Sequence, residues 1–384
     1  MSREDFDALV VADARFSGGS TGALAADVTA LSELGLRIGL LFVRSGYLDD
    51  ARDPPNPKAL ALRDLPGVTA LAPGATARAE FAFLHHPLVF ARGIQERADL
   101  RADHALLIAH HQPFRSDGSV EYNPFDALRR ARAALGLSAR IAPVSAAVRA
   151  QLAAYAPLLR QTGLDWPNIF DPRDWPIHRA PFDDNVVTIG RHGRADALKF
   201  PATGPEIDAS LPTSPTLRVR VLGCPADDLA ARGAHPDRWD VLAFGAEPVP
   251  DFLNSLDIFT YHYHPRLVEA FGRTVVEAIL AGRPCLLDPR LRPTFGDLAH
   301  YCAPTEVADA VGRIASDPAG ARIRALDARV ETSKRFGSAA IADRLERLRR
   351  DPGDASRRHG TTPPLTLARK LAGHYRRRLG GATG

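Results

Sequence analysis

Two carboxylates flank a glycine within residues 257–288 and could bind a ligand that carries both hydroxyls and phosphates. Glu269 precedes Phe271-Gly272-Arg273, and Glu277 follows them. A helix that starts near Gly272 would present unpaired backbone N–H groups, and these suit a phosphate because the helix dipole stands behind them. Glycine lets the backbone approach the ligand closely. A carboxylate on each side suits hydroxyls instead, so the set of groups fits a nucleotide sugar.

The elements around these residues are expected to form one strand–loop–helix–strand unit of an α/β sheet. The run 257–261 is β-branched and aromatic, which predicts a buried strand. Residues 274–281 have apolar and small side chains at helical spacing, and Gly282 provides a stop signal. A second apolar strand is predicted over 284–288. This arrangement places Glu269 before the helix and Glu277 on its second turn.

The same stretch resembles a known family of enzymes. The pattern Glu269-x7-Glu277, followed by Ala281-Gly282-Arg283-Pro284, resembles the signature of retaining, nucleotide-sugar-dependent glycosyltransferases of family 4 (group 1), which have the GT-B fold. The resemblance covers about residues 7–350 and is strongest over 185–288. It implies an α/β chain with two Rossmann-like domains facing a central cleft. An ordinary helix start with acidic residues is the alternative interpretation.

The resemblance also implies an activity and roles for individual residues. A sugar would pass from a nucleotide diphosphate sugar (UDP-, GDP- or ADP-sugar) to a hydroxyl acceptor such as a glycan, a lipid-linked sugar or a small molecule, with retention of anomeric configuration. Glu277 is assigned to the ribose hydroxyls and Glu269 to hydroxyls of the transferred sugar. The substrate-binding backbone is that of Phe271, Gly272 and Arg273.

Two cations follow the first strand predicted for the second half of the chain, over 185–189. Arg191 and Lys199 resemble the diphosphate clamp of the family, and Arg194 is an alternative for the first position. A departing nucleoside diphosphate gains negative charge in the transition state, which fixed cations stabilise. Arginine can bind it bidentately and lysine supplies a point charge. Ordinary surface basic residues are the alternative.

The chain begins with a pattern typical of a Rossmann-like domain. A strand is predicted over 7–14, a helix over 23–34 and a second strand over 36–43, with a glycine loop between the first two. The resemblance places Gly18 and Gly19 beside the donor phosphate and the acceptor. The same loop also matches G-x-S-x-G, so a serine hydrolase that uses Ser20 is an alternative function. A non-catalytic sugar-nucleotide-binding protein is another.

A histidine pair ends the strand predicted over 104–109. The resemblance assigns a functional histidine to this position, where His111 matches the pattern and His110 is the second candidate. An imidazole there can hydrogen-bond a sugar hydroxyl or stabilise developing charge. The alternative is a histidine pair that only caps the strand.

Length and composition shifts predict the domain organisation. A chain of 384 residues suits two domains of ordinary size, and prolines and tryptophans concentrate over 160–181. The expected parts are an N-terminal acceptor domain (1–165), a linker (166–182) and a C-terminal nucleotide-sugar donor domain (183–330). A closing helix that packs back on the first domain (331–350) and a basic tail (351–384) follow.

Composition argues against several classes of site. The three cysteines suggest neither a disulfide framework nor a zinc site, and they fit a cytoplasmic location. No cofactor or metal is expected, because the Asp-x-Asp motif Asp5-Phe6-Asp7 precedes the first strand instead of following one. No run of apolar residues reaches the length of a membrane span. The net charge of +4 is mild, and no fold signal supports nucleic-acid binding.

The C-terminal segment has a different character. Residues 355–384 contain no acidic residue, and their apolar side chains recur at roughly helical spacing among arginines. A basic amphipathic segment of this kind could lie on an anionic membrane surface. The protein would then be peripheral on the inner face of the membrane. A loosely docked solubilising tail is the alternative.

Overall fold

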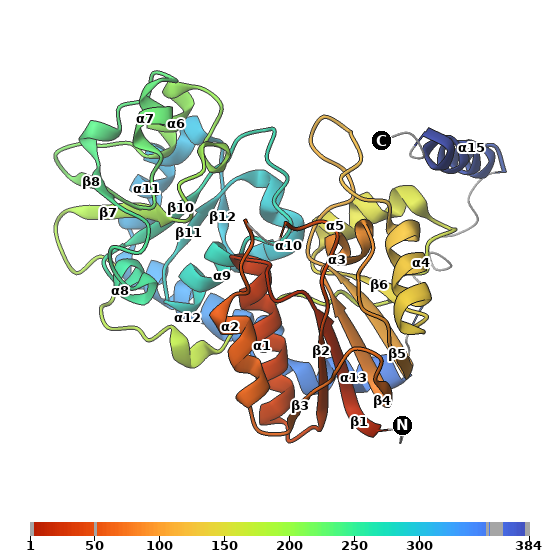
Figure 1. Cartoon of the computed structure of the whole chain (residues 1–384). Coiled ribbons are helices and arrows are strands. Elements are labelled where there is room, and N and C mark those ends of the chain that lie inside the picture. Colours follow the sequence, from red (N-terminus) through yellow and green to blue (C-terminus); the bar gives the residue numbers. More distant parts are fainter. Residues whose placement is uncertain (1–3, 50–51, 351–352, 354–363, 381–384) are drawn as a thin grey trace. The chain divides into compact units, whose positions relative to one another are not determined.

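A computed structural model describes residues 4–49, 52–350, 353 and 364–380. The chain divides into two compact units (Figure 1). Unit 1 comprises residues 1–114, 118–168 and 341–384, and unit 2 comprises 115–117 and 169–340. Each unit contains one six-stranded sheet, and all strand pairs are parallel. Two parallel α/β units match the Rossmann-like architecture predicted from the sequence.

The sheet of unit 1 has β1 near its centre, and the strand order reverses around it. In spatial order its strands are β3 (Val68–Ala70), β2 (Ile38–Phe42), β1 (Glu4–Ala12), β4 (Thr76–His85), β5 (Asp99–Ala109) and β6 (Arg140–Pro143). The carboxyl ends of parallel strands lie at one edge of the sheet, where α/β proteins bind ligands.

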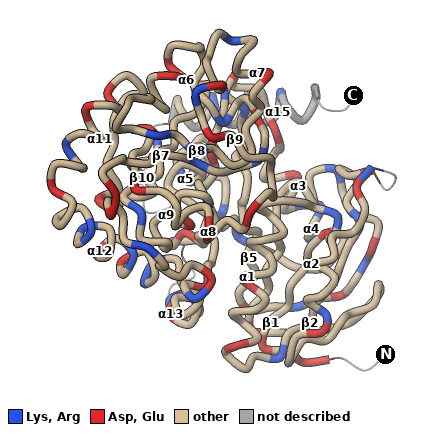
Figure 2. Tube along the Cα trace, turned by 90° about the vertical axis from the view of Figure 1, so that its left-hand side faces the viewer, with Lys and Arg blue, Asp and Glu red and all other residues tan. Residues whose placement is uncertain are grey.

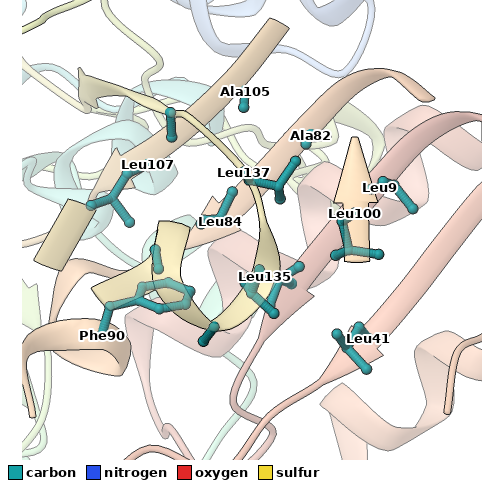
Figure 3. Packing of buried hydrophobic residues seen from close by; sticks show 14 of the residues in the cluster. Leu9, Leu41, Ala82, Leu84, Phe90, Leu100, Ala105, Leu107, Leu135 and Leu137 are labelled. Carbon is teal, nitrogen blue, oxygen red and sulfur yellow. The ribbon is translucent and has the colours of Figure 1, made fainter. Parts of the chain in front are cut away.

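Helices from distant parts of the sequence complete unit 1. They are α1 (Gly19–Glu33), α2 (Pro57–Leu60), α3 (Pro87–Ala91), α4 (Pro124–Leu135), α5 (Ala146–Leu152), α13 (Ala340–Arg350) and α15 (Pro364–Gly380). Leu84 and Leu107 of the sheet pack in one buried cluster with Phe90 of α3 and Leu135 of α4 (Figure 3). Burial of these apolar side chains is the main force that holds helices on the sheet.

The glycine loop predicted after β1 is shorter than expected. The sequence predicted a helix over 23–34, but α1 begins at Gly19, so Gly19–Gly22 form its first turn. Gly18 precedes the helix with φ 69°, and the Gly22 N–H donates to its carbonyl. The small residues after Gly18 therefore belong to the helix, because a left-handed glycine is a suitable boundary.

The closing helix predicted over 331–350 is in fact two helices. The first, α12 (Pro318–Phe336), ends before Gly337, and α13 begins at Ala340. A Cβ on Gly337 would lie 2.2 Å from the Ser333 carbonyl oxygen, so only glycine allows this close approach. Arg349 of α13 donates to both carboxylate oxygens of Glu80 on β4, which places α13 against unit 1 (Figure 1).

Unit 2 has the same strand arrangement. In spatial order its strands are β12 (His300–Tyr301), β11 (Cys285–Leu287), β10 (Ile258–Tyr261), β7 (Val187–His192), β8 (Leu217–Leu222) and β9 (Asp240–Leu242). Its other helices are α6 (Gly204–Ser210), α7 (Ala226–Ala230), α8 (Val249–Asn254), α9 (Arg273–Leu280), α10 (Arg292–Phe295) and α11 (Val307–Ala315). The strand–loop–helix–strand unit predicted over 257–288 is therefore β10, α9 and β11.

Charged residues of both signs are interspersed along most of the chain (Figure 2). The sequence of α15, in contrast, contains basic residues and no acidic one. Of the basic tail predicted over 351–384, residues 351–352, 354–363 and 381–384 lie outside the described residues. Among the helices that the structure describes, none has the length and apolar content needed to cross a membrane.

Candidate functional site

The chemical groups predicted for the second half of the chain gather at the carboxyl edge of the unit 2 sheet. There, β7 ends at His192 and β10 ends at Tyr261, and the loop after β10 leads to the start of α9 at Arg273. The adjacent pairing of β7 and β10 brings these strand ends together. In open parallel sheets this edge is the usual place for a ligand.

Lys199, Tyr261, Glu269 and Gly272 form one continuous hydrogen-bonded chain. The Lys199 Nζ donates to the Tyr261 hydroxyl at 3.0 Å and lies 3.3 Å from Glu269 Oε2. The tyrosine hydroxyl donates to the same Glu269 oxygen at 2.7 Å. The second oxygen, Oε1, accepts from the Gly272 N–H at 3.1 Å. Glu269 therefore links the lysine to the start of α9.

The charges in this chain stabilise one another. Burial alone would raise the pKa of Glu269, but Lys199, the Tyr261 hydroxyl and the Gly272 N–H outweigh it and lower that pKa overall. Burial raises the pKa of Tyr261 well above its usual value, so the phenol keeps its proton and acts as a donor. The result is a Lys199 cation and a Glu269 anion side by side, with 18% and 15% of their side chains exposed.

Gly272 shapes the start of α9. Its φ of 89° is left-handed, and a Cβ there would lie 3.2 Å from the Phe295 ring. Both the backbone conformation and the neighbouring ring therefore favour glycine. No side chain caps this helix start, so the first N–H groups of α9 are not satisfied by a capping side chain.

Arg191 lies in the same site but is not open to solvent. Its side chain is buried between the rings of Phe200 and Tyr261, at 4.2 and 4.7 Å, and Nη1 donates to the His262 carbonyl at 2.8 Å. Burial lowers its pKa to about 10, which still leaves a cation at neutral pH. A ligand in this site would therefore meet only the positive field of Arg191 unless the arginine side chain moved. The alternative cation, Arg194, is exposed in the loop after β7.

Glu277 faces His192 across the site. Its Oε2 lies 3.3 Å from His192 Nε2, and Arg273 Nη2 lies 3.9 Å from Oε1. Burial raises the pKa of Glu277, and Arg273 and Lys199 oppose that rise. Burial lowers the pKa of His192 to about 3, with Arg191 and Lys199 adding to the effect. His192 is therefore neutral and can serve Glu277 as a hydrogen-bond donor but not as a counter-ion.

The Phe271 side chain belongs to the core of unit 2. It is buried and packs at 5.4 Å from the Phe336 ring and at 6.2 Å from the Phe295 ring. Only the backbone of Phe271 can therefore meet a ligand, as the sequence analysis assumed. Arg273 lies over the Phe170 ring at 4.4 Å, which holds its guanidinium beside Glu277.

In unit 1, Gly18 and Gly19 form the start of α1, and both are exposed. Ser20 is the second residue of α1, and residues 13–18 separate the helix from the end of β1. A nucleophile elbow instead needs the serine on a sharp turn directly between strand and helix. The local geometry therefore does not match the hydrolase motif.

Four histidines gather at the carboxyl ends of β4 and β5. His85 and His110 rings stack with centroids 5.4 Å apart, and His86 stacks on both His110 and His111 at 6.0 and 6.1 Å. The Tyr122 hydroxyl donates to the His111 carbonyl at 3.0 Å. The described residues contain no group of three or more potential ligands placed to hold a metal ion.

Two residues of the unit 2 site were missed by the sequence analysis. Tyr261 lies in the run 257–261, which was taken only as a buried strand, and His192 was given no role. Each is the last residue of its strand. The rule that ligand-binding side chains follow the carboxyl ends of parallel strands could have found both.

The fold has counterparts among solved structures. Anabaena Alr3699/HepE was solved with UDP, with UDP and glucose, and with UDP-glucose. Its complex with UDP and glucose matches this chain with a TM-score of 0.60 at 14% identity, and the match covers 89% of this chain and 98% of HepE. A glycosyltransferase from Rickettsia africae matches with a TM-score of 0.57 at 11% identity, over 91% and 99%. WaaG, a glycosyltransferase involved in lipopolysaccharide biosynthesis, matches with a TM-score of 0.51 at 12% identity, over 85% of this chain and 95% of WaaG.

No protein-family model matches the sequence, and no curated protein matches it. At identities of 11–14% the likeness to the solved structures is one of fold. It extends over both units and over nearly the whole length of each neighbour. The two Rossmann-like units of this chain therefore have the GT-B fold of these glycosyltransferases.

Proposed function

We propose that the protein is a glycosyltransferase that takes a sugar from a nucleotide diphosphate sugar. The observation that carries this proposal is the chain from Lys199 through Tyr261 and Glu269 to the uncapped start of α9. It combines a fixed cation, a helix N-terminus and a carboxylate within one site, as a sugar diphosphate requires. The neighbour HepE, which shares the fold, was solved with UDP and with UDP-glucose.

Each group has a proposed role in the transfer. Lys199 and the first N–H groups of α9 bind the diphosphate and stabilise the charge that it gains as the glycosidic bond breaks. Arg191 adds positive field from behind Tyr261. Glu277 accepts hydrogen bonds from the ribose, and Glu269 accepts from hydroxyls of the sugar. In unit 1, the start of α1 at Gly18 and Gly19 and the pair His110–His111 contact the sugar or its acceptor.

The stereochemical course is proposed to be retention, and the acceptor to be a hydroxyl. The support for retention is the spacing of Glu269 and Glu277 and its resemblance to retaining family 4 enzymes. The nucleotide is proposed to be a uridine, guanosine or adenosine diphosphate. The product's anomeric configuration, read by proton NMR, distinguishes retention from inversion.

Thermal unfolding in the presence of nucleotides tests the proposal. A ligand that binds only the folded state at about a hundred times its Kd adds about 2.7 kcal/mol of stability. UDP, GDP or ADP is therefore expected to raise the melting temperature by several degrees, and the matching sugar nucleotide should do the same. If none of the diphosphates or their glucose, galactose or mannose conjugates shifts it, the donor site is refuted. Binding without release of the diphosphate in the presence of hydroxyl acceptors would support a non-catalytic binder instead.

We also propose that α15 binds an anionic membrane surface at the inner face of a cytoplasmic membrane. Leu365 and Tyr375 of this helix are exposed, at 68% and 59%, and Arg369 and Arg376 are exposed as well. Lys370 anchors the helix to unit 1 by donating to the Ala156 carbonyl at 2.7 Å. Apolar and basic groups on one anchored helix suit a surface of acidic lipids.

Vesicle sedimentation tests this surface. The full chain is expected to sediment with phosphatidylglycerol vesicles, and less with phosphatidylcholine vesicles, because acidic lipids attract arginines within about a Debye length. A chain that ends at Arg350 should remain in the supernatant in both cases. Equal sedimentation of the two chains would mean that α15 is not the membrane contact.

A further inference from the structure

A basic hollow lies at the outer edge of the unit 2 sheet, where β12 is the last strand. Its volume is about 390 Å³, and small-molecule sites typically have volumes of about 300–1,000 Å³. Three arginines from three helices line it, Arg292 of α10, Arg313 of α11 and Arg324 of α12. His300 of β12 also lines it, and Asp297 is the one carboxylate among the described residues that do so. The donor site, in contrast, lies at the carboxyl ends of β7 and β10.

The protein itself neutralises little of the positive charge in this basic hollow. Arg324 lies 3.5 Å from Asp317, and this pair is exposed, so water screens it. Within the described residues, Arg292 and Arg313 form no ion pair with a carboxylate. Arg292 instead lies over the Tyr301 ring at 4.5 Å, which holds the guanidinium in place and leaves its charge intact. The hollow therefore has a positive field that an anion would neutralise.

The two residues of β12 do not offset this field. Desolvation lowers the pKa of His300, and Arg324 and Arg313 lower it further. The Tyr301 hydroxyl donates to the Gly296 carbonyl at 2.7 Å, and burial raises the pKa of this tyrosine to about 12, so it keeps its proton at neutral pH. Neither side chain therefore supplies a negative charge to the arginines.

A second hollow, of about 460 Å³, adjoins the basic one. The two share four lining residues, namely Asp297, Ala299, His300 and Arg324. The second hollow is also lined by the carboxylates Asp327 and Glu331 and by apolar side chains such as Pro284 and Leu298. Its mixed charges do not favour an anion. The negative end of a ligand would therefore occupy the basic hollow, and a larger body would extend into the second one.

We propose that the basic hollow binds the phosphate group of a phosphate monoester, which belongs either to a soluble compound or to the headgroup of an acidic lipid. Arginine suits phosphate because its planar guanidinium stays charged and offers paired N–H donors. Three arginines on separate helices present such donors from different directions, which fits a tetrahedral dianion better than a flat carboxylate. The described residues that line the hollow include none of those assigned to the donor. This second ligand site therefore does not depend on the proposed glycosyl transfer.

Glycerol 3-phosphate tests the basic hollow, with His300 as a local reporter. A phosphate dianion beside the imidazole favours its protonated form, so the pKa of His300 in the full chain should rise by about 0.5–1 pH unit at saturation. ¹H–¹⁵N correlation spectra of histidine-labelled protein at constant ionic strength follow this titration, and His300→Gln identifies the signal. Lys199→Ala should respond as the native chain does, because the donor site takes no part in this binding.

Arg313→Gln and Arg324→Gln test the arginines, separately and together. Without ligand, each change should raise the pKa of His300, because a repelling cation has been removed. Each should weaken the binding of glycerol 3-phosphate about 10–100-fold, the usual effect of losing a hydrogen bond to a charged group. Arg218→Gln, which removes an exposed arginine of β8, should bind as tightly as the native chain.

Vesicles that contain phosphatidic acid distinguish the two sources of the phosphate. If the ligand is a lipid headgroup, the full chain with both Arg313→Gln and Arg324→Gln should sediment less with these vesicles than the native chain, and Arg218→Gln should sediment equally with it. Equal sedimentation of all three, together with a response of His300 to glycerol 3-phosphate, identifies a soluble ligand. The site is overturned if His300 does not respond and the double variant sediments like the native chain. It is also overturned if Arg218→Gln weakens binding as much as Arg313→Gln, since the effect would then be one of general surface charge.

Discussion

Lys199→Ala is expected to lower kcat/KM with the donor sugar nucleotide by about 10²–10³-fold, the usual loss when one fixed group that stabilises transition-state charge is removed. Lys199 is a partly exposed cation of the unit 2 site, and its Nζ is held by the Tyr261 hydroxyl and Glu269. Alanine removes the charge but leaves Glu269 with its hydrogen bonds from Tyr261 and the Gly272 N–H. The fold should therefore survive, as circular dichroism can check.

The nucleotide itself shows which phosphate the lysine contacts. The native chain is expected to bind UDP more tightly than UMP by calorimetry, because UDP has the β-phosphate. Lys199→Ala should lose most of that preference, while Lys58→Ala, which removes an exposed lysine of unit 1, should keep it. If Lys199→Ala still prefers UDP as strongly as the native chain, Lys199 does not bind the β-phosphate. If GDP or ADP stabilises the protein in place of UDP, the same comparison applies to its monophosphate.

The fold was largely predictable because it depends on patterns that extend over many residues. The apolar runs of β1, β5 and β10 and the stop at Gly282 mark strands and helices by their period and their boundaries. Boundaries that depend on a single close contact were not predictable. The break at Gly337 depends on the close approach of the Ser333 carbonyl oxygen to the Gly337 backbone, which only the three-dimensional structure shows.

The site was predictable only for residues next to a glycine or in a short motif. Glu269, Gly272 and Lys199 were named in advance, and the structure places them in one hydrogen-bonded chain. The burial of Arg191 between two rings could not be foreseen, because those rings come from Phe200 and Tyr261, which are distant from each other in sequence. The contact of His110 with His85 was missed for the same reason, since His85 lies at the end of another strand.

Glu277→Gln is expected to weaken donor binding about 10–100-fold with little change in kcat, because an interaction made equally in the ground and transition states affects binding alone. The carboxylate can accept from two ribose hydroxyls, whereas the amide has one acceptor oxygen. The native chain should therefore bind UDP more tightly than 2′-deoxyuridine diphosphate, and the variant should show a much smaller preference. Glu331→Gln, an exposed change in unit 2, should behave like the native chain.

The pH dependence and the stability of the same variant provide independent checks. Burial raises the pKa of Glu277, so donor binding to the native chain should weaken as the pH falls through that raised value, and the Glu277→Gln variant should lack this weakening. Without ligand, an acid whose pKa is raised by folding is destabilising when it is ionised, above that pKa. Glutamine removes this penalty, so the melting temperature of the free variant near neutral pH should equal or exceed that of the native chain. A variant that melts clearly lower, or that discriminates against the deoxynucleotide as strongly as the native chain, would instead make Glu277 a structural residue and would remove the ribose from its assigned place.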